Sequence, residues 1–391
     1  MPINFRTLPL AAALAVVSCL LVGGGSAQAA RGMEIAIQDD APLLNDLYSS
    51  RDFVLQRAQE LGVTHIRANV VWSRAVGNVA HRRRAPAQIT YNWGPYDALI
   101  DGAAARGMRV QLVLTGPAPA WATANRRVGV YKPKAGSFSA FARAAAEHFK
   151  GRVARYGIWN EPNWKGWLAP LTSSPQLYRN LYAAGYRAIK RADPRAQVLI
   201  GETSPTGRAG KSIAPLKFLR AIACVDDRYR RVGHCRALTA DGFAHHPYAF
   251  ERPPEAPTIG ADNVTLGSLS RLTKALDQLA RVRALRGPRG RRLGLYLTEY
   301  GFFARGSRAF SERVRADYLR RGFSIAQKNR RVRQMLQYQL AKPPRRYDWD
   351  TSLLTAGGRA TRPYTVLRAW IRRAAVARQP RGGIGLPPAP Q

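Results

Sequence analysis

The sequence RYGIWNEPNW covers residues 155–164 and contains the junction that is most informative about the fold. Its first five residues, 155–159, form a short and mainly apolar run that is typical of a buried strand. Pro162 disfavours helical geometry at the residue before it and cannot donate to a sheet, so we expect the strand to end here. The carboxyl group of Glu161 therefore emerges at the C-terminal end of a strand.

Seven more runs of this kind alternate with longer amphipathic stretches. The expected strands are 33–38, 65–71, 109–114, 155–159, 197–200, 242–245, 293–297 and 332–338. The expected helices lie near 51–61, 96–106, 137–149, 176–192, 215–223, 266–284, 311–328 and 362–377. Eight such units predict an α/β protein with a (β/α)8, or TIM, barrel. A doubly wound sheet is the alternative, but it usually has a Gly-rich turn after its first strand, where this chain has residues 38–42, QDDAP.

Capping residues support several of the expected helices. Ser50 and Ser311 precede the first and seventh helices and are good N-caps, and Pro175 is suited to a first turn. Gly62 and Gly107 follow helices, where a left-handed C-cap favours glycine.

The two ends of the chain differ in composition from the rest. Residues 1–29 combine Arg6, an apolar run from Leu8 to Val22 and an Ala27-Gln28-Ala29 cleavage site, which indicates a secretory signal peptide. The run is shorter than the about 20 residues that a membrane span needs, although an uncleaved anchor is the alternative. Residues 379–391 are rich in Pro and Gly and predict a disordered tail. We therefore expect a secreted catalytic domain over residues 30–378, monomeric and without stable membrane insertion after signal cleavage.

Two cysteines remain after the signal segment. Cys224 and Cys235 are separated by ten residues in a charged segment. In an exported chain such a pair predicts one disulfide that closes a short loop. Metal binding is the weaker alternative, because two thiolates alone do not complete a tetrahedral site.

The chain of 391 residues is strongly basic. It contains 62 Lys+Arg and 24 Asp+Glu, which gives a net charge of +38. Such a charge is compatible with nucleic acid or anionic polymers as partners. We favour a compositional origin over a nucleic-acid surface, because only 10 of the basic residues are Lys and the rest are Arg, as GC-rich coding produces. Anionic cell-wall polymers remain candidate partners.

A second carboxylate follows another expected strand. Residues 295–301, LYLTEYG, place Glu299 just after the seventh strand, as Glu161 follows the fourth. The C-terminal ends of barrel strands open on one face, so we expect both carboxylates in the same cavity. Two carboxylates across a cleft are the groups that glycoside hydrolysis uses. Trp164 and neighbouring indoles would partly desolvate Glu161, which suits a general acid.

The Asn160-Glu161-Pro162 motif together with Glu299 resembles the clan A retaining glycoside hydrolases. The resemblance covers about residues 33–373 and is closest to the family 39 and family 5 β-glycosidases in their bacterial, secreted form. It implies a (β/α)8 barrel in which Glu161 is the acid/base and Glu299 is the nucleophile of a double displacement.

The resemblance also implies roles for further residues. Arg67 on the second strand and Tyr248 after the sixth would hydrogen-bond the nucleophile, and His246 would lie beside them. Asn160 would bind the sugar 2-hydroxyl, and Trp349 after the eighth strand would form the floor of the sugar site.

Other polar and aromatic residues near strand ends are candidate substrate contacts. Trp164 could stack on sugar, and Asp39 could bind hydroxyls or cap the following turn. Glu202 follows the fifth expected strand as a third carboxylate, which could bind substrate, pair with an Arg or replace one of the two assigned catalysts.

The sequence thus predicts a secreted retaining glycoside hydrolase acting on an oligo- or polysaccharide, with no metal or cofactor. The alternatives are a non-catalytic sugar-binding barrel and a basic binding protein for anionic polysaccharides. The sugar, exo or endo cleavage and transglycosylation are open, because loop shape decides them.

Overall fold

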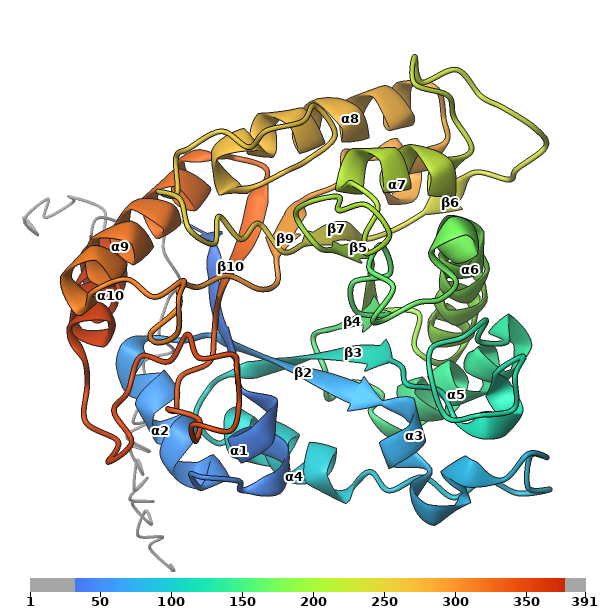
Figure 1. The fold of residues 1–391 in the computed structure, drawn as a ribbon. Helices are drawn as coiled ribbons and strands as arrows, with labels where there is room; N and C mark the ends of the chain where they lie inside the picture. The colour runs from blue at the N-terminus through green and yellow to red at the C-terminus, as the bar shows by residue number, and fades with distance from the viewer. Residues whose placement is uncertain (1–31, 377–391) are drawn as a thin grey trace, which may run out of the picture.

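The computed structural model describes residues 32–376, in which eight parallel strands close into a barrel (Figure 1). β1 pairs with β2 on one side and with β10 on the other, which closes the cylinder. The predicted (β/α)8 barrel is confirmed. The barrel strands are β1 (Glu34–Gln38), β2 (His65–Val71), β3 (Arg109–Thr115), β4 (Arg155–Ile158), β5 (Gln197–Thr203), β7 (Gly242–His245), β9 (Leu295–Leu297) and β10 (Val332–Tyr338).

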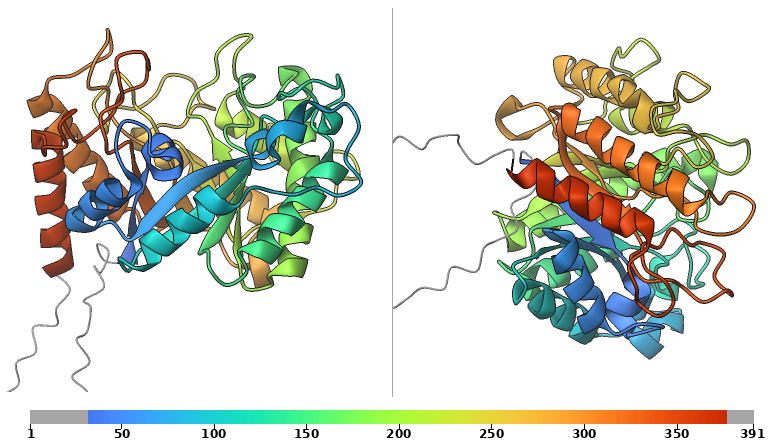
Figure 2. Two further views of the ribbon diagram at one scale, coloured as in Figure 1. Left: turned by 90° about the horizontal axis from the view of Figure 1, so that it is seen from below. Right: turned by 90° about the vertical axis from the view of Figure 1, so that its left-hand side faces the viewer.

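One long helix follows each barrel strand and packs on the outside of the sheet (Figures 1 and 2). Two short helices, α1 (Asp40–Asn45) and α3 (Trp72–Ala75), lie in the loops after β1 and β2. The long helices are α2 (Arg51–Leu61), α4 (Gly94–Ala104), α5 (Ala135–His148), α6 (Ser174–Ala192), α7 (Pro215–Ala223), α8 (Leu269–Arg281), α9 (Glu312–Lys328) and α10 (Arg362–Val376). No helix in this part of the chain is both long and apolar enough to span a bilayer.

The predicted helix signals act as expected at α2 and α9. The Ser50 side chain accepts a hydrogen bond from the amide of Phe53, and Gly62 ends α2 with φ 93°. Ser311 caps α9 in the same way by accepting from the amide of Val314. These contacts satisfy amide donors that the first turn of a helix leaves free.

Strand alternation separates the outer core from the barrel interior. In β2, Ile66, Ala68 and Val70 belong to the apolar core. Arg67 and Asn69 alternate with them, so their side chains face the interior of the barrel. The same alternation brings polar side chains from several strands together inside the barrel.

Arg155 is a charged residue at the start of the apolar run of β4, and contacts at the bottom of the barrel compensate for its burial. Arg155 is 2% exposed and its Nη2 donates to Glu34 Oε1 at 2.7 Å. Its guanidinium lies 4.6 Å from the centroid of the Tyr296 ring. A buried charge is tolerated when it is paired and hydrogen-bonded in this way.

Two differences from the expected strands affect the site and the sheet pairing. β5 extends to Thr203, beyond the expected end at 200, with a bulge between Gly201 and Thr203. Glu202 therefore lies within a strand and not in the loop after it. The short parallel pair β6 (Leu238–Thr239) and β8 (Leu285–Arg286) was not expected, because two-residue strands carry no periodic pattern.

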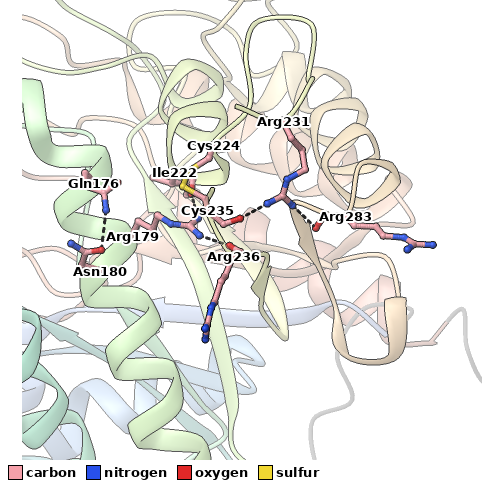
Figure 3. Close-up of a disulfide and its surroundings, with 9 residues drawn as sticks. All are labelled: Gln176, Arg179, Asn180, Ile222, Cys224, Arg231, Cys235, Arg236 and Arg283. Carbon is pink, nitrogen blue, oxygen red and sulfur yellow. Dashed lines mark hydrogen bonds between the residues drawn. A yellow bond between two sulfur atoms is a disulfide. The ribbon is translucent and has the colours of Figure 1, made fainter. Parts of the chain in front are cut away.

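The predicted disulfide between Cys224 and Cys235 is present (Figure 3). It closes the segment after α7, and the Arg179 guanidinium donates to the backbone carbonyls of Ile222 and Arg236 on either side of the loop. The loop is thus held covalently at its ends and by hydrogen bonds from α6. The expected signal peptide and tail lie outside the described residues.

Candidate active site

Glu161 and Glu299 both open into one cleft at the C-terminal end of the barrel. Glu161 follows β4 and Glu299 follows β9, and both line a cavity of about 480 Å³. Cavities that hold small ligands measure about 300–1,000 Å³, so this cleft is of ligand-binding size. The structure thus brings together the two carboxylates that lie 138 positions apart in the sequence.

The contacts of His246 set an upper limit on the distance between the two carboxylates. Its Nδ1 lies 3.0 Å from Glu161 Oε1 and 3.7 Å from Glu299 Oε2. These two oxygens are therefore separated by less than about 7 Å, a limit that includes the about 5–5.5 Å spacing of retaining glycosidases.

The chain turns sharply where it delivers Glu161 to the cleft. Trp159 and Glu161 have positive φ angles of 62° and 37°, a left-handed conformation that non-glycine residues rarely adopt. The surrounding structure holds this turn: the Trp159 indole donates to the Trp167 carbonyl at 2.7 Å, and the Glu161 amide donates to the Glu202 carbonyl at 2.9 Å. Such strain is typical of functional sites, where neighbouring contacts compensate for it.

Two side chains hold the carboxylate of Glu299. Arg67 Nη1 donates to Oε1 at 2.9 Å, and the Tyr248 hydroxyl donates to Oε2 at 3.2 Å. Burial raises the pKa of Glu299, while the positive charges of His246 and Arg67 oppose this by favouring the ionised form. Both expected partners of Glu299 are thus in contact with it.

Arg67 connects the groups of the site from the centre of the barrel. It is fully buried, and its Nη2 donates to Asn160 Oδ1 at 2.8 Å and to Glu202 Oε2 at 3.1 Å. Gln38 Oε1 accepts from the other terminal nitrogen, Nη1. The planar guanidinium is suited to this task, because its donors point in several fixed directions in one plane.

Glu202 lies beneath the cleft and does not line it. It is fully buried and accepts from Thr298 Oγ1 at 2.7 Å, in addition to its contact with Arg67. Burial acts to raise the pKa of this carboxyl, but Arg67 and the hydrogen bonds from His246 and Thr298 outweigh it and lower the pKa. Of the three roles considered for Glu202, the structure shows the pairing with an Arg.

His246 lies between the carboxylates. Its Nε2 is 3.2 Å from Glu202 Oε2, opposite the Nδ1 contact with Glu161. Burial lowers its pKa, but Glu299, Glu161 and Glu202 overcome this and raise the pKa to about 9. As an imidazolium it donates from both ring nitrogens. The adjacent His245 points away, to Thr203 and the Val264 carbonyl, as strand alternation predicts.

Three predicted aromatic residues line the cleft. Tyr248 and Trp349 lie next to each other, with ring centroids 5.5 Å apart, and Trp164 presents a 40% exposed indole near Glu161. Asn160 also lines the cleft. These groups offer flat apolar faces and an amide to a sugar.

Asp39 does not reach the cleft, in contrast to its expected contact with sugar hydroxyls. It is 2% exposed, and its Oδ2 accepts from the amides of Leu340 and Ala341 at 3.0 and 2.8 Å. The Tyr48 hydroxyl donates to Oδ1. Burial raises the pKa of Asp39 to about 7. Asp39 therefore ties the end of β1 to the segment after β10.

Several cleft residues were missed by sequence analysis. All follow the C-terminal ends of strands or lie within the last three residues of one, which is the one signal that pointed to them, but their loops have no fixed spacing. They are Asn69, Ser204, Pro205, Thr206, Arg208, Lys211, Ser212, Phe250, Arg308 and Tyr338.

Part of the chain matches a known protein family. Residues 29–223 match the sequence model of the cellulase family, glycosyl hydrolase family 5. No curated protein matches the chain.

Solved structures share the fold at low sequence identity. A family 39 glycoside hydrolase of Bacteroides cellulosilyticus superposes with a TM-score of 0.65 and 17% identity, covering 86% of this chain and 63% of that enzyme. A family 39 β-xylosidase of Caulobacter crescentus has a TM-score of 0.56 and 18% identity, covering 87% and 71%. The endoglucanase Cel5A of Thermotoga maritima has a TM-score of 0.53 and 14% identity, covering 88% and 98%. The chain thus spans less than two thirds of the length of the Bacteroides enzyme.

The family match over residues 29–223 and the closed parallel barrel define the class: the chain contains a glycoside hydrolase domain. Within that class it has the clan A fold, with structural neighbours in families 39 and 5.

Proposed function

We propose that the protein is a secreted, retaining β-glycosidase in which Glu299 is the nucleophile and Glu161 is the acid/base. The observation that carries the proposal is the contact of both cleft carboxylates with the same ring nitrogen of His246. The resulting upper limit of about 7 Å between these oxygens is compatible with the spacing of retaining glycosidases and supports direct attack by one of the carboxylates.

In the first step a Glu299 oxygen attacks the anomeric carbon. A carbon–oxygen bond forms to Glu299 while the bond to the leaving oxygen breaks, and Glu161 transfers its proton to that oxygen. Arg67 and Tyr248 hold Glu299 in position through both of its oxygens. His246 Nδ1 donates to the carboxylate that forms on Glu161 as its proton leaves.

In the second step water replaces Glu299 at the anomeric carbon. Glu161, now ionised, accepts a proton from this water, and the Glu299 carboxylate is released. Two inversions at the same carbon give net retention of configuration.

Asn160 is positioned to bind the sugar during both steps. Its Oδ1 accepts from Arg67, which turns the amide so that its Nδ2 is available to the cleft. An amide donor fixed in this way suits a sugar hydroxyl, and contacts to the 2-hydroxyl strengthen at the transition state.

The test is a screen of chromogenic aryl β-glycosides, beginning with glucosides and xylosides because the relatives are named as a cellulase family, a β-xylosidase and an endoglucanase. Glu299→Gly should abolish turnover and regain it with azide, giving an α-glycosyl azide. Glu161→Gln should lower kcat about 10²–10⁴-fold on substrates with poor leaving groups and much less on dinitrophenyl glycosides.

The stereochemistry decides between mechanisms. Proton NMR of the first product should show the β-anomer, and an α-anomer would show inversion and remove the nucleophile role from Glu299. A wild-type protein that binds sugars but cleaves none would instead identify a sugar-binding barrel. Export is checked by sequencing the N-terminus of the mature protein, which should start near Ala30.

A further inference from the structure

The cleft contains more positive charge than the chemistry uses. Its two carboxylates, Glu161 and Glu299, are both assigned to catalysis, whereas Arg208, Lys211 and Arg308 also line it. Among the described residues, no carboxylate is in ion-pair distance of Arg208 or Lys211, and the nearest to Arg308 is Glu251 at 4.0 Å. The cationic lining is therefore open to a ligand.

Arg208 and Lys211 lie on a loop that is fixed beside the acid/base. Arg208 and Ser212 pair across a tight turn, and Trp164 forms a backbone bridge with Ser212. The Lys165 amide donates to the Lys211 carbonyl at 2.9 Å. The backbone amide of Trp164 in turn donates to the Glu161 carbonyl at 2.9 Å. This loop thus belongs to the wall next to the group that protonates the leaving oxygen.

Asn163 strengthens the connection between the two loops. Its side-chain Nδ2 donates to the carbonyls of Ser204 and Ile213 at 3.2 and 2.8 Å, and its Oδ1 accepts from the Ser204 amide at 2.9 Å. A residue two positions after Glu161 therefore holds both ends of the 204–213 segment. The two cations occupy defined positions and are not carried on a free loop.

Arg308 lies in the segment between β9 and α9, which also carries Glu299. Its guanidinium carbon is 4.1 Å from the Phe303 ring centroid and 5.9 Å from that of Trp349. Stacking on aromatic faces fixes the plane of a guanidinium and leaves its edge donors free. Trp349 also contacts Tyr248, the hydrogen-bond partner of Glu299.

We infer that the cleft accepts an anionic glycan, whose carboxylate or sulfate groups are bound by Arg208 and Lys211 on the leaving-group side and by Arg308 on the glycosyl side. The inference rests on the proposed function, because the acid/base and the nucleophile define these two sides. Uronic acids and sugar sulfates share the required chemistry, a negatively charged group on the sugar ring that accepts bidentate hydrogen bonds.

The test compares ligands that differ only in charge. The Glu161→Gln protein is titrated at about 0.15 M salt, an ionic strength that screens distant charges. The ligands are chondroitin sulfate, its desulfated form and the desulfated form after carboxyl reduction, with oligogalacturonate and its carboxyl-reduced form as a second backbone. We expect the anionic member of at least one series to bind about tenfold tighter than its neutral counterpart, the effect of one charge-assisted hydrogen bond.

A matched pair of variants separates local from global charge. Arg208→Gln/Lys211→Gln, made in the Glu161→Gln background, should lose most of the anionic preference. Arg187→Gln/Lys274→Gln removes the same net charge from exposed positions on α6 and α8 and should keep it. Equal binding of charged and neutral ligands, absence of binding to both backbones, or equal loss in the two double variants would overturn the inference.

The outcome is distinguishable from failure of the proposed function. Cleavage of neutral aryl glycosides without any anionic preference would refute the anionic glycan and leave the glycosidase. Anionic binding that depends on Arg208 and Lys211, with no cleavage of any glycoside, would support the charge recognition and refute the glycosidase.

Discussion

Tyr248→Phe tests how the nucleophile is kept ionised. The change removes one hydroxyl, which donates to Glu299 Oε2 at 3.2 Å, and leaves the ring in place. Tyr248 is 2% exposed, so water has little access to replace the lost donor. A hydrogen bond to a charged group contributes about 1.5–3 kcal/mol. We therefore expect kcat/KM to fall about 10- to 150-fold.

The change in the pH profile of kcat/KM should have a defined direction. The lost hydrogen bond favours the ionised form of Glu299, so its removal raises the pKa of this carboxyl. The acidic limb of kcat/KM should move up by about one to two pH units. The assay is hydrolysis of the best aryl glycoside from the screen, measured from pH 4 to 9.

Tyr156→Phe is the matched control. Tyr156 is fully buried in β4, and its hydroxyl has no hydrogen-bond partner among the described residues. The same atom is removed away from the cleft, so kcat/KM and its pH profile should not change. An unchanged acidic limb in Tyr248→Phe, or equal changes in both variants, would refute the role of this hydrogen bond.

Three further predictions concern stability, measured by urea unfolding. Glu202→Gln should cost about 3 kcal/mol, the lower end of the range for breaking a buried pair, because Arg67 keeps its contact with Glu299; a change below 1 kcal/mol would contradict this. Replacing Cys224 and Cys235 by Ser should cost about 3 kcal/mol through the short loop they close, and wild type under reducing conditions should lose the same amount. The pKa of His246 is raised to about 9, so its contribution to the free energy of unfolding is complete below about pH 6.5. This contribution, up to about 3 kcal/mol, is lost as the pH rises through 9. In His246→Gln the decline in stability between pH 6.5 and 9 should disappear.

The barrel could be predicted because its signals are local. Each strand is a short apolar run, and residues such as Ser50 and Ser311 mark helix starts through contacts with amides three positions away. The positions of Glu161 and Glu299 followed from the same logic, since parallel strands in a barrel all end on one face.

The roles of other strand-end residues could not be predicted in this way. Asp39 and Glu202 occupy places in the sequence pattern similar to those of Glu161 and Glu299, yet neither lines the cleft. The bulge in β5 sets the direction of the Glu202 side chain. The amides of Leu340 and Ala341, about 300 positions away in the sequence, donate hydrogen bonds to the Asp39 carboxylate. Neither cause is visible in the local sequence.

The basic residues also show the difference between what the local sequence and what the tertiary structure determine. The sequence by itself determined the fold class, the two cleft carboxylates and the disulfide, because strand periodicity, barrel geometry and cysteine number are properties of short stretches. Only the tertiary structure decided which charges face the cleft. Arg208, Lys211 and Arg308 are three of 62 basic residues, and they line the cleft because their loops pack near Trp164 and Trp349. The physical reason is that a side chain's direction depends on its packing partners, which come from distant parts of the chain.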